Sequence, residues 1–297
     1  MNLLVTGAWG QAKAHIPELK AMGHEVVFLQ QEKDALPVEP AWVEGVICNG
    51  LFLSHPIESF PNLRFIQLTS AGYDRVDMDY IAAHNIEIHN ARGVYSIPMA
   101  EFALWGVLDV YKGGRGFAES RKAHAWVKQR NLRELKGKTV TIIGCGDVGT
   151  ECARRFRAFG CRIWGVDRVV KDTPEYDRTV LTAQMDELLP ETDVLLLTVA
   201  LTPETRHMIG KRQFEQMKND AVLVNISRGA VVDTDALLDW LNRNPAAHAV
   251  LDVFEEEPLD PVSPLWDMEN VLATPHNSFV GDGNEGRLWE KIFSTGD

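Results

Sequence analysis

Positive charge is scarce in this sequence of 297 residues. Its 30 lysines and arginines are outnumbered by 42 aspartates and glutamates, which gives a formal net charge of −12. Nucleic acids and anionic membranes are bound through clustered lysine and arginine side chains. The charge balance therefore argues against a nucleic acid or a membrane as a partner. It does not exclude a small anionic substrate, which needs only a few local charges.

Cysteines are few and none is placed like a metal ligand. The four cysteines are Cys48, Cys145, Cys152 and Cys161. They form no CxxC motif, and no histidine stands at a zinc-ligand spacing from a cysteine pair. We expect four free thiols and no metal, which is typical of a protein in the reducing cytoplasm.

Long apolar runs are absent as well. Runs such as Val194–Leu197 are far shorter than the roughly 20 residues that span a bilayer. Met1 is followed directly by the strand-like Leu3-Leu4-Val5, without the basic stretch of a secretory signal. The sequence predicts a soluble, cytoplasmic protein.

Short apolar segments alternate with amphipathic stretches along the whole chain, which predicts parallel sheets covered by helices. The length is about twice that of a typical domain, so two domains are expected. The predicted strands are Leu3–Thr6, Glu25–Leu29, Gly45–Cys48, Phe65–Leu68, Ile86–His89, Thr139–Ile143, Cys161–Val166, Asp193–Val199, Ala221–Ile226, Ala249–Phe254 and Val271–Ala273.

A long helix is predicted to begin near Pro98, since proline suits a first helical turn, and to end at Gly113-Gly114. The stretch from Arg115 to Arg133 is polar and basic, with Trp126 as its one large apolar residue. We interpret it as a connecting segment at the surface or at a subunit interface.

Residues 144–149 read GxGxxG between a predicted strand and a predicted helix. Glycines let the backbone approach a pyrophosphate, whose charge is stabilised at the helix N-terminus. Asp167 ends the next strand, where a carboxylate binds the ribose hydroxyls and repels a 2′-phosphate. NAD is therefore favoured over NADP, although the neighbouring Arg168 weakens that preference. Two alternatives stay open, namely an ordinary glycine-rich turn and the similar loop of an adenosyl-binding methyltransferase.

Three further strand ends carry the side chains for hydroxy-acid chemistry. Arg228 offers a guanidinium, Glu257 a carboxylate and His276 an imidazole. An arginine grips a substrate carboxylate and polarises the adjacent carbonyl, while a carboxylate-paired histidine transfers the proton. Each residue alone also fits an ordinary surface position, so the prediction depends on their combination after a dinucleotide motif.

With these motifs the sequence resembles the D-isomer-specific 2-hydroxyacid dehydrogenase family over almost its whole length. The matching stretches are Thr69–Asp74, Asn90–Ser96 with Ala100-Glu101, Leu135–Lys138, Gly144–Gly149, Leu201–Thr205, Asn225–Gly229 with Asp233, Asp252–Phe254, Glu257-Pro258 and Pro275-His276.

The resemblance implies a Rossmann-type NAD-binding domain, residues 99–274, inserted into a flavodoxin-like substrate domain formed by residues 1–98 and 275–297. It also implies NAD as the cofactor, a small 2-oxo or 2-hydroxy acid as the substrate, and a homodimer. Arg228, Glu257 and His276 match the catalytic residues of the family.

Further site residues follow from the same resemblance. The cofactor contacts are Gly144, Gly146, Asp147, Val148, Gly149, Asp167, Arg168, Thr205, Ile226 and Asp252. The substrate contacts are Ala71, Gly72, Tyr73, Val94, Tyr95 and Arg228, with Arg92 as a further candidate. For Tyr73 and Tyr95, a packing role is the open alternative.

Four positions depart from the family pattern. Asp147 stands where a basic or neutral residue is usual, which puts a pyrophosphate contact in doubt. Ala200 replaces a usual proline and Cys145 a usual aliphatic residue. Asp297 is expected to lie short of the family's final helix.

The strongest rival function is a non-catalytic NAD(H)-sensing regulator of the same fold. A formate dehydrogenase is disfavoured, because that group has glutamine where Glu257 stands. A phosphoglycerate dehydrogenase stays open, although we see no appended regulatory domain in this sequence and no clear phosphate-binding cluster in the first domain. The sequence leaves glyoxylate, hydroxypyruvate, pyruvate and bulkier 2-oxo acids as candidate substrates.

Overall fold

A computed structural model describes residues 1–294 of the chain. The chain divides into two compact units, which are treated separately. Unit 1 contains Met1–Tyr95 and Gly281–Asp297, and unit 2 contains Ser96–Val280. The sequence placed the corresponding boundaries after residues 98 and 274. Within the described residues, no helix has the length and apolarity that crossing a membrane requires.

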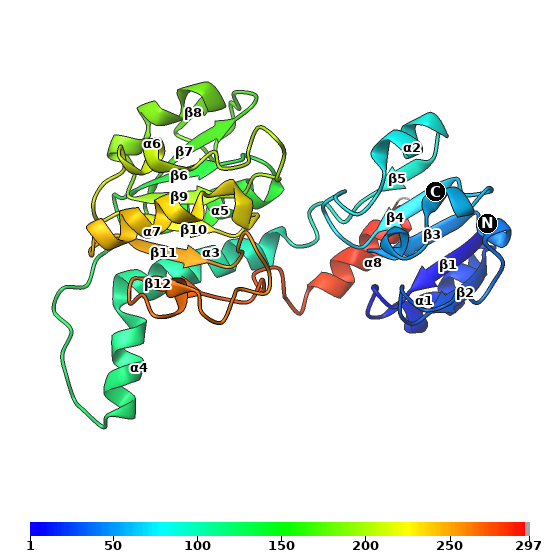
Figure 1. Cartoon of the computed structure of the whole chain (residues 1–297), viewed down its shortest axis with the longest axis horizontal. Helices are drawn as coiled ribbons and strands as arrows, with labels where there is room; N and C mark the ends of the chain where they lie inside the picture. The colour runs from blue at the N-terminus through cyan, green and yellow to red at the C-terminus, as the bar shows by residue number, and fades with distance from the viewer. Residues whose placement is uncertain (295–297) are drawn as a thin grey trace. The chain divides into compact units, whose positions relative to one another are not determined.

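Unit 1 is built on a five-stranded parallel sheet with the order β2-β1-β3-β4-β5 (Figure 1). The strands are β1 (Asn2–Thr6), β2 (Glu25–Leu29), β3 (Gly45–Cys48), β4 (Phe65–Leu68) and β5 (Glu87–His89). The helices are α1 (Ala12–Ala21), α2 (Met78–Ala83), α8 (Asn284–Ser294) and the 3-10 turns η1 (Pro40–Trp42), η2 (Leu51–Leu53) and η3 (Ile57–Ser59).

Alternate residues of β1 enter two separate cores on the two faces of this sheet, as the period of a strand requires. Leu3 and Val5 pack with buried residues of α1 and α8, whereas Leu4 packs with Ile81 of α2. Helices therefore cover both faces, and the side chains available for function lie at the strand ends.

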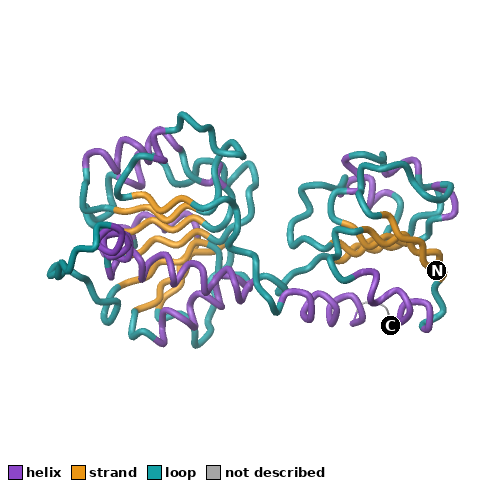
Figure 2. Tube along the Cα trace, turned by 90° about the horizontal axis from the view of Figure 1, so that it is seen from below, coloured by secondary structure: helices purple, strands orange, loops and turns teal. Residues whose placement is uncertain are grey.

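Unit 2 contains a seven-stranded parallel sheet, β12-β11-β10-β9-β6-β7-β8, with helices on both faces (Figures 1 and 2). The strands are β6 (Thr139–Ile143), β7 (Arg162–Asp167), β8 (Arg178–Leu181), β9 (Val194–Leu197), β10 (Val222–Asn225), β11 (His248–Leu251) and β12 (Val271–Ala273). The helices are α3 (Ser96–Lys112), α4 (Gly114–Lys122), α5 (Asp147–Ala158), α6 (Lys211–Phe214), α7 (Thr234–Arg243) and the 3-10 turns η4 (Thr182–Glu187), η5 (Leu189–Glu191), η6 (Gly229–Val231) and η7 (Pro264–Trp266).

The order of the unit 2 sheet determines where a ligand is expected. From β6 the chain proceeds to β7 and β8 on one side, and β9 to β12 lie on the other side. The strand order therefore reverses between β6 and β9, and ligands of such sheets bind outside the carboxyl ends at that point.

Two elements of unit 2 differ from the sequence prediction. Strand β8 was not predicted, because as an edge strand it buries only Val180 well. The segment predicted as a connection after Gly114 begins with α4, a helix without buried residues. Neither element has the apolar periodicity that marks a helix or strand in a sequence.

Candidate active site

The glycine turn after β6 has the backbone geometry that its sequence predicted. Gly144 has a φ of +97°, which favours glycine. A Cβ added to Gly149 would lie 2.1 Å from the Gly144 carbonyl oxygen, so the start of α5 packs directly on the strand end. Gly146 caps α5 without any side-chain hydrogen bond, and a Cβ there would meet nothing within 4 Å. The helix N-terminus is thus open to an anion.

Asp167, at the end of β7, lies against this turn. Its Oδ2 accepts a hydrogen bond from the Cys145 N–H (2.9 Å), and its Oδ1 accepts one from the Arg168 N–H (2.6 Å). Lys171, which the sequence analysis did not select, donates from Nζ to the Cys145 carbonyl (2.7 Å). A carboxylate with spare lone pairs therefore stands beside the turn, with a cation near it.

The other predicted cofactor residues of the turn region occupy different surroundings. Asp147 is the first residue of α5, where a carboxylate faces the positive end of the helix. Val148 packs against the core beneath α3. The Thr205 hydroxyl accepts from the Thr202 N–H (2.8 Å), and the residue is half-buried. Ile226 is buried, so its side chain belongs to the core.

A dinucleotide fits the groups that unit 2 presents. The open end of α5 and the glycine turn suit a pyrophosphate, and the carboxylate of Asp167 suits the ribose hydroxyls. Within residues 1–294, no group of three or more histidine, cysteine or acidic side chains is arranged to hold a metal ion.

Arg228 stands on a rigid turn after β10. The buried side chain of Asn225 accepts from the Ser227 N–H (3.0 Å) and donates to the Arg228 carbonyl (3.0 Å). The Arg228 guanidinium donates to the Ser227 carbonyl (2.8 Å) and is half-buried. Because the backbone is tied at both ends of the turn, the guanidinium projects from a fixed base.

Glu257 and His276 are brought together, although 19 residues separate them in the sequence. Nδ1 of His276 lies 2.7 Å from Oε2 of Glu257, and Glu257 Oε1 accepts from the Phe254 N–H (3.0 Å). His276 has a φ of +52°, which is uncommon outside glycine. The side chains remain accessible, at 40% for His276 and 36% for Glu257.

Asp252 is fully buried, and its carboxylate orders the loop that carries His276. It accepts hydrogen bonds from the Thr274 hydroxyl (2.7 Å), the Asn277 N–H (2.7 Å) and the Ser278 N–H (2.8 Å). A buried charge requires such partners. The side chain thus supports the His276 loop, a role that the sequence analysis did not assign to it.

In unit 1, the loops after β4 and β5 are joined to each other. Asn90 donates to the Ala71 carbonyl (2.7 Å), and the Tyr95 hydroxyl donates to the Thr69 carbonyl. The Val94 N–H donates to the Ala91 carbonyl (3.1 Å) and is therefore engaged within its own turn.

The backbone amides of Ala71 and Gly72 differ from that of Val94. Within residues 1–294 they donate no hydrogen bond, so they are available to an anion. Tyr73, next in the loop, is 38% exposed. Of the predicted clamp on a substrate carboxylate, two backbone donors are thus free.

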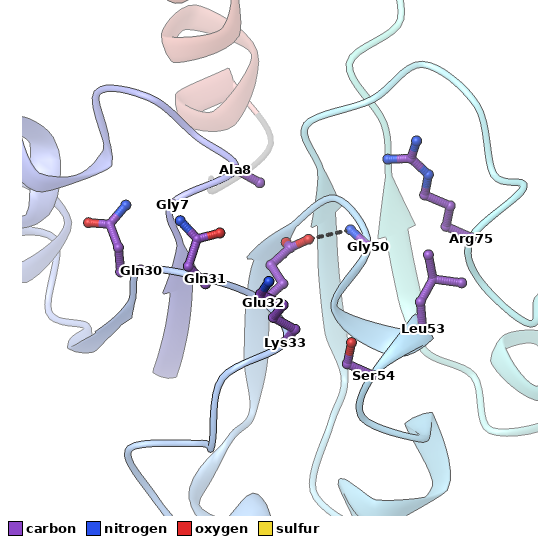
Figure 3. Close-up of a pocket in the computed structure, with 10 residues that line it drawn as sticks. All are labelled: Gly7, Ala8, Gln30, Gln31, Glu32, Lys33, Gly50, Leu53, Ser54 and Arg75. Atoms are coloured by element: carbon purple, nitrogen blue, oxygen red, sulfur yellow. Dashed lines mark hydrogen bonds between the residues drawn. The ribbon is translucent and has the colours of Figure 1, made fainter. Parts of the chain in front are cut away.

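Unit 1 also contains a cavity of about 400 Å³ that the sequence did not predict (Figure 3). It lies at the carboxyl ends of β1, β2 and β3, and Gly7, Gln31 and Arg75 are among its lining residues. Glu32 also lines it, and its carboxylate accepts from the Gly50 N–H (2.6 Å). The predicted substrate contacts of unit 1 are not among the residues that line this cavity.

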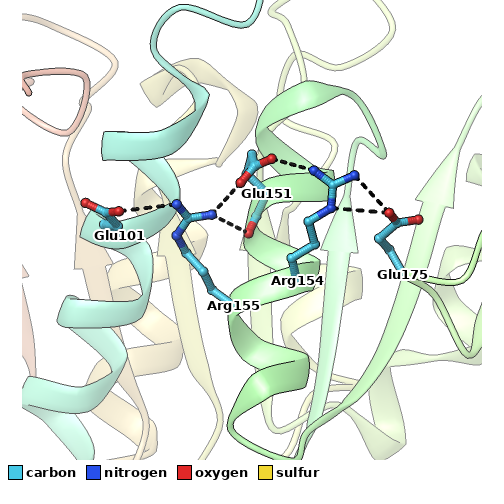
Figure 4. Close-up of polar contacts among 5 residues, drawn as sticks. All are labelled: Glu101, Glu151, Arg154, Arg155 and Glu175. Atoms are coloured by element: carbon cyan, nitrogen blue, oxygen red, sulfur yellow. Dashed lines mark hydrogen bonds and ion pairs between the residues drawn. The ribbon is translucent and has the colours of Figure 1, made fainter. Parts of the chain in front are cut away.

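An ion-pair network joins α3, α5 and the chain after β7 (Figure 4). Arg155 contacts Glu101 at 3.2 Å and Glu151 at 2.5 Å, and Arg154 contacts Glu151 at 2.6 Å and Glu175 at 3.0 Å. Hydrogen bonds from Arg154 hold the pKa of Glu175 below its usual value. Arg154 and Glu101 are exposed, whereas the side chains of Arg155, Glu151 and Glu175 are mostly buried. The network attaches α5 to α3.

Comparison with known proteins gives consistent matches. The family described as D-isomer specific 2-hydroxyacid dehydrogenase, NAD binding domain, matches residues 104–278. A glyoxylate reductase of Korarchaeum cryptofilum is 36% identical over 272 residues, covering 87% of this chain and 82% of that protein.

Two solved structures are similar over the whole chain. D-lactate dehydrogenase from Aquifex aeolicus, complexed with NAD and lactic acid, is 27% identical with a TM-score of 0.82, covering 99% of this chain and 94% of that one. A D-isomer specific 2-hydroxyacid dehydrogenase from Xanthobacter autotrophicus, in complex with NADPH and MES, is 26% identical with a TM-score of 0.78, covering 97% and 91%.

Proposed function

Because the chain belongs to the D-isomer-specific 2-hydroxyacid dehydrogenase family, we propose that it reduces a small 2-oxo acid with Arg228, Glu257 and His276 as catalytic residues. The predicted fold class, the enzyme class and NAD as the cofactor are confirmed. The alternative of a non-catalytic regulator has no support among the relatives named above.

The observation that carries the proposal is the pairing of His276 with Glu257. Nδ1 of the imidazole is engaged by the carboxylate at 2.7 Å, while Nε2 has no hydrogen-bond partner within residues 1–294. The carboxylate fixes the orientation of the ring. Nε2 is thereby the nitrogen that exchanges a proton with a substrate oxygen.

The remaining groups divide the work of recognition. Arg228 binds the substrate carboxylate and polarises the neighbouring carbonyl. In unit 1, the free amides of Ala71 and Gly72 are donors suited to a carboxylate. The turn at residues 144–149 and Asp167 would hold NADH, which would supply the hydride. His276 gives its proton to the carbonyl oxygen, which yields the 2-hydroxy acid.

We assign cofactor binding to unit 2, which also carries the three proposed catalytic residues, and further substrate contacts to unit 1. Glyoxylate is the first candidate substrate, because the Korarchaeum relative is named a glyoxylate reductase. Of the departures from the family pattern, Asp147 bears on the cofactor, since it places a negative charge at the helix end that would face the pyrophosphate.

We further propose that the protein is a homodimer and that it is located in the cytoplasm. In unit 2, α4 and the loop after it project away from the sheet (Figure 1). This arm exposes 96% of Trp126 and 44% of Phe117, which favours burial in a second copy. All four cysteines are free and buried, in keeping with a reducing compartment.

The test is NADH consumption by the purified protein with a panel of 2-oxo acids that includes glyoxylate, hydroxypyruvate and pyruvate. We expect turnover that the His276→Ala variant loses while it still binds NADH. If no 2-oxo acid is reduced although NADH binds, the proposed reaction is wrong and a sensing role gains support.

A further inference from the structure

A second histidine–glutamate pair in unit 2 takes its glutamate from the loop that carries Glu257. Nε2 of His207 is 2.8 Å from Oε2 of Glu255, two residues before Glu257. The residues are 48 positions apart in the sequence and come from the loops after β9 and β11. The predicted catalytic residues do not include either of them, so the pair needs a separate explanation.

The carboxylate of Glu255 also holds the start of α7. Its Oε1 accepts from the Thr234 N–H (3.0 Å) and from the Thr234 hydroxyl (2.6 Å). Burial alone would raise the pKa of Glu255, but hydrogen bonds from Thr234 and His207 outweigh it and hold the pKa below its usual value. One ionised carboxylate thus joins the loop of Glu257 to α7 and to His207.

The backbone near His207 runs along the segment that follows Arg228. The His207 N–H donates to the Ala230 carbonyl (2.8 Å), and Ile209 forms a parallel bridge with Val232. His207 therefore contacts the Arg228 segment through its backbone and the Glu257 loop through its side chain.

These two loops also touch each other directly. A Cβ added to Gly229 would lie 1.8 Å from the carbonyl carbon of Phe254, so only glycine allows this approach. A small shift of residues 254–255 would consequently displace both Arg228 and Glu257.

Backbone conformation singles out the same histidines. Among residues 1–294, the non-glycine residues with positive φ are Asn85, His124, His207 and His276. The two histidines of unit 2 that pair with a glutamate both adopt this uncommon conformation. Such conformations persist where the surroundings enforce them, and they concentrate at functional sites.

We propose that His207 and Glu255 are a positioning pair, which keeps the Arg228 turn and the Glu257–His276 pair in their relative positions. This inference depends on the proposed function, because it assigns the pair a role in that reaction. Neither side chain is assigned a contact with substrate or cofactor.

The experiment compares His207→Ala and Glu255→Ala with the control Glu256→Ala, which removes an exposed carboxylate from the same loop. We expect kcat to fall roughly ten- to a hundred-fold in the two test variants, since small misplacements of catalytic groups cost that much. The Kd for NADH should stay unchanged. The double variant should be no slower than the slower single variant, because the two side chains act as one unit.

A conservative variant separates positioning from folding. His207→Gln keeps an N–H donor for Glu255 and should recover most of the lost kcat. Loss of kcat to the same extent in His207→Gln, or in Glu256→Ala, would overturn the proposal.

Hydrogen exchange in the full-length protein supplies a readout that does not need turnover. The amides of Val231, Val232 and Asp233 are hydrogen-bonded in the segment that follows Arg228. They should exchange faster in His207→Ala and Glu255→Ala than in the wild type. Unchanged exchange together with unchanged kcat would overturn the positioning pair. A wild type that reduces no 2-oxo acid would overturn the proposed function, whatever the exchange rates are.

Discussion

Glu257 is oriented by the backbone before it orients His276. Its Oε1 accepts from the Phe254 N–H at 3.0 Å, and its Oε2 lies 2.7 Å from Nδ1 of His276. The two oxygens thus have different tasks, and the imidazole is held from a fixed point. The catalytic contribution of Glu257 is therefore expected to pass through His276.

Replacing His276 by alanine should lower kcat roughly a hundred- to ten-thousand-fold, because the proton transfer loses its donor. Glu257→Gln should lower kcat less, since the imidazole remains in place. Steady-state kinetics measure both effects, and fluorescence titration measures the binding of NADH. A His276→Ala variant that no longer binds NADH would show that the residue has another role.

Replacing Arg228 by lysine should remove most activity, although the charge is retained. One ammonium does not reproduce the two parallel hydrogen bonds of a guanidinium on a carboxylate. The surface variant Arg212→Lys is the matched control and should behave like the wild type. Near-normal kcat/KM for Arg228→Lys would contradict the assigned role.

Replacing Asp167 by alanine should relax the preference between the two cofactors. The carboxylate that repels a 2′-phosphate is removed, while Arg168 and Lys171 remain nearby. The ratio of kcat/KM for NADH and NADPH is the measurement, with Asp267→Ala as the surface control. If that ratio does not move, the ribose assignment of Asp167 is wrong.

Replacing Trp126 by serine should weaken the proposed homodimer. The substitution removes an indole that is exposed in one copy and that we expect the second copy to bury. Sedimentation velocity across a range of protein concentrations measures the change. Val262→Ser is the matched control, since Val262 is 85% exposed and lies outside the arm. A wild type that is monomeric at every concentration would rule out the dimer.

Asp193 should make the stability of the protein sensitive to acid. Burial alone would raise its pKa, but hydrogen bonds from Lys218 and the Thr139 N–H outweigh it and hold the pKa below the usual value. A depressed carboxyl pKa stabilises the fold above the unfolded-state pKa of about 3.9, and this stabilisation is lost as the pH falls through the folded-state pKa.

The substitution Asp193→Asn should therefore lower the free energy of unfolding by about 1 kcal/mol at neutral pH. The difference from the wild type should shrink as the pH falls below about 4. Urea unfolding at several pH values is the measurement, with Asp267→Asn as the control. A difference that persists unchanged in acid would show that the charge is not its cause.

Local signals in the sequence were enough for much of the fold. The predicted strands Gly45–Cys48, Phe65–Leu68 and Thr139–Ile143 coincide with β3, β4 and β6, because each is a short apolar run between turns. The glycine turn was equally readable, since Gly144 has a positive φ and Gly149 packs on the Gly144 carbonyl five residues before it.

Other features have no such local signal. Strand β8 forms through its pairing with β7. Helix α4 has no buried residues, so no apolar periodicity marks it in the sequence. Cavity residues such as Glu32 and Arg75 come together only because β2 and β4 end at the same edge of one sheet.

The sequence by itself determined the family, the parallel strands and the three residues proposed for the chemistry. Only the tertiary structure decided that Asp252 turns its carboxylate inward to the His276 loop, and that His207 reaches Glu255. The physical reason is the range of the interactions involved. Apolar periodicity and turn geometry act over a few residues, whereas hydrogen bonds between strand-end loops depend on which strands become neighbours.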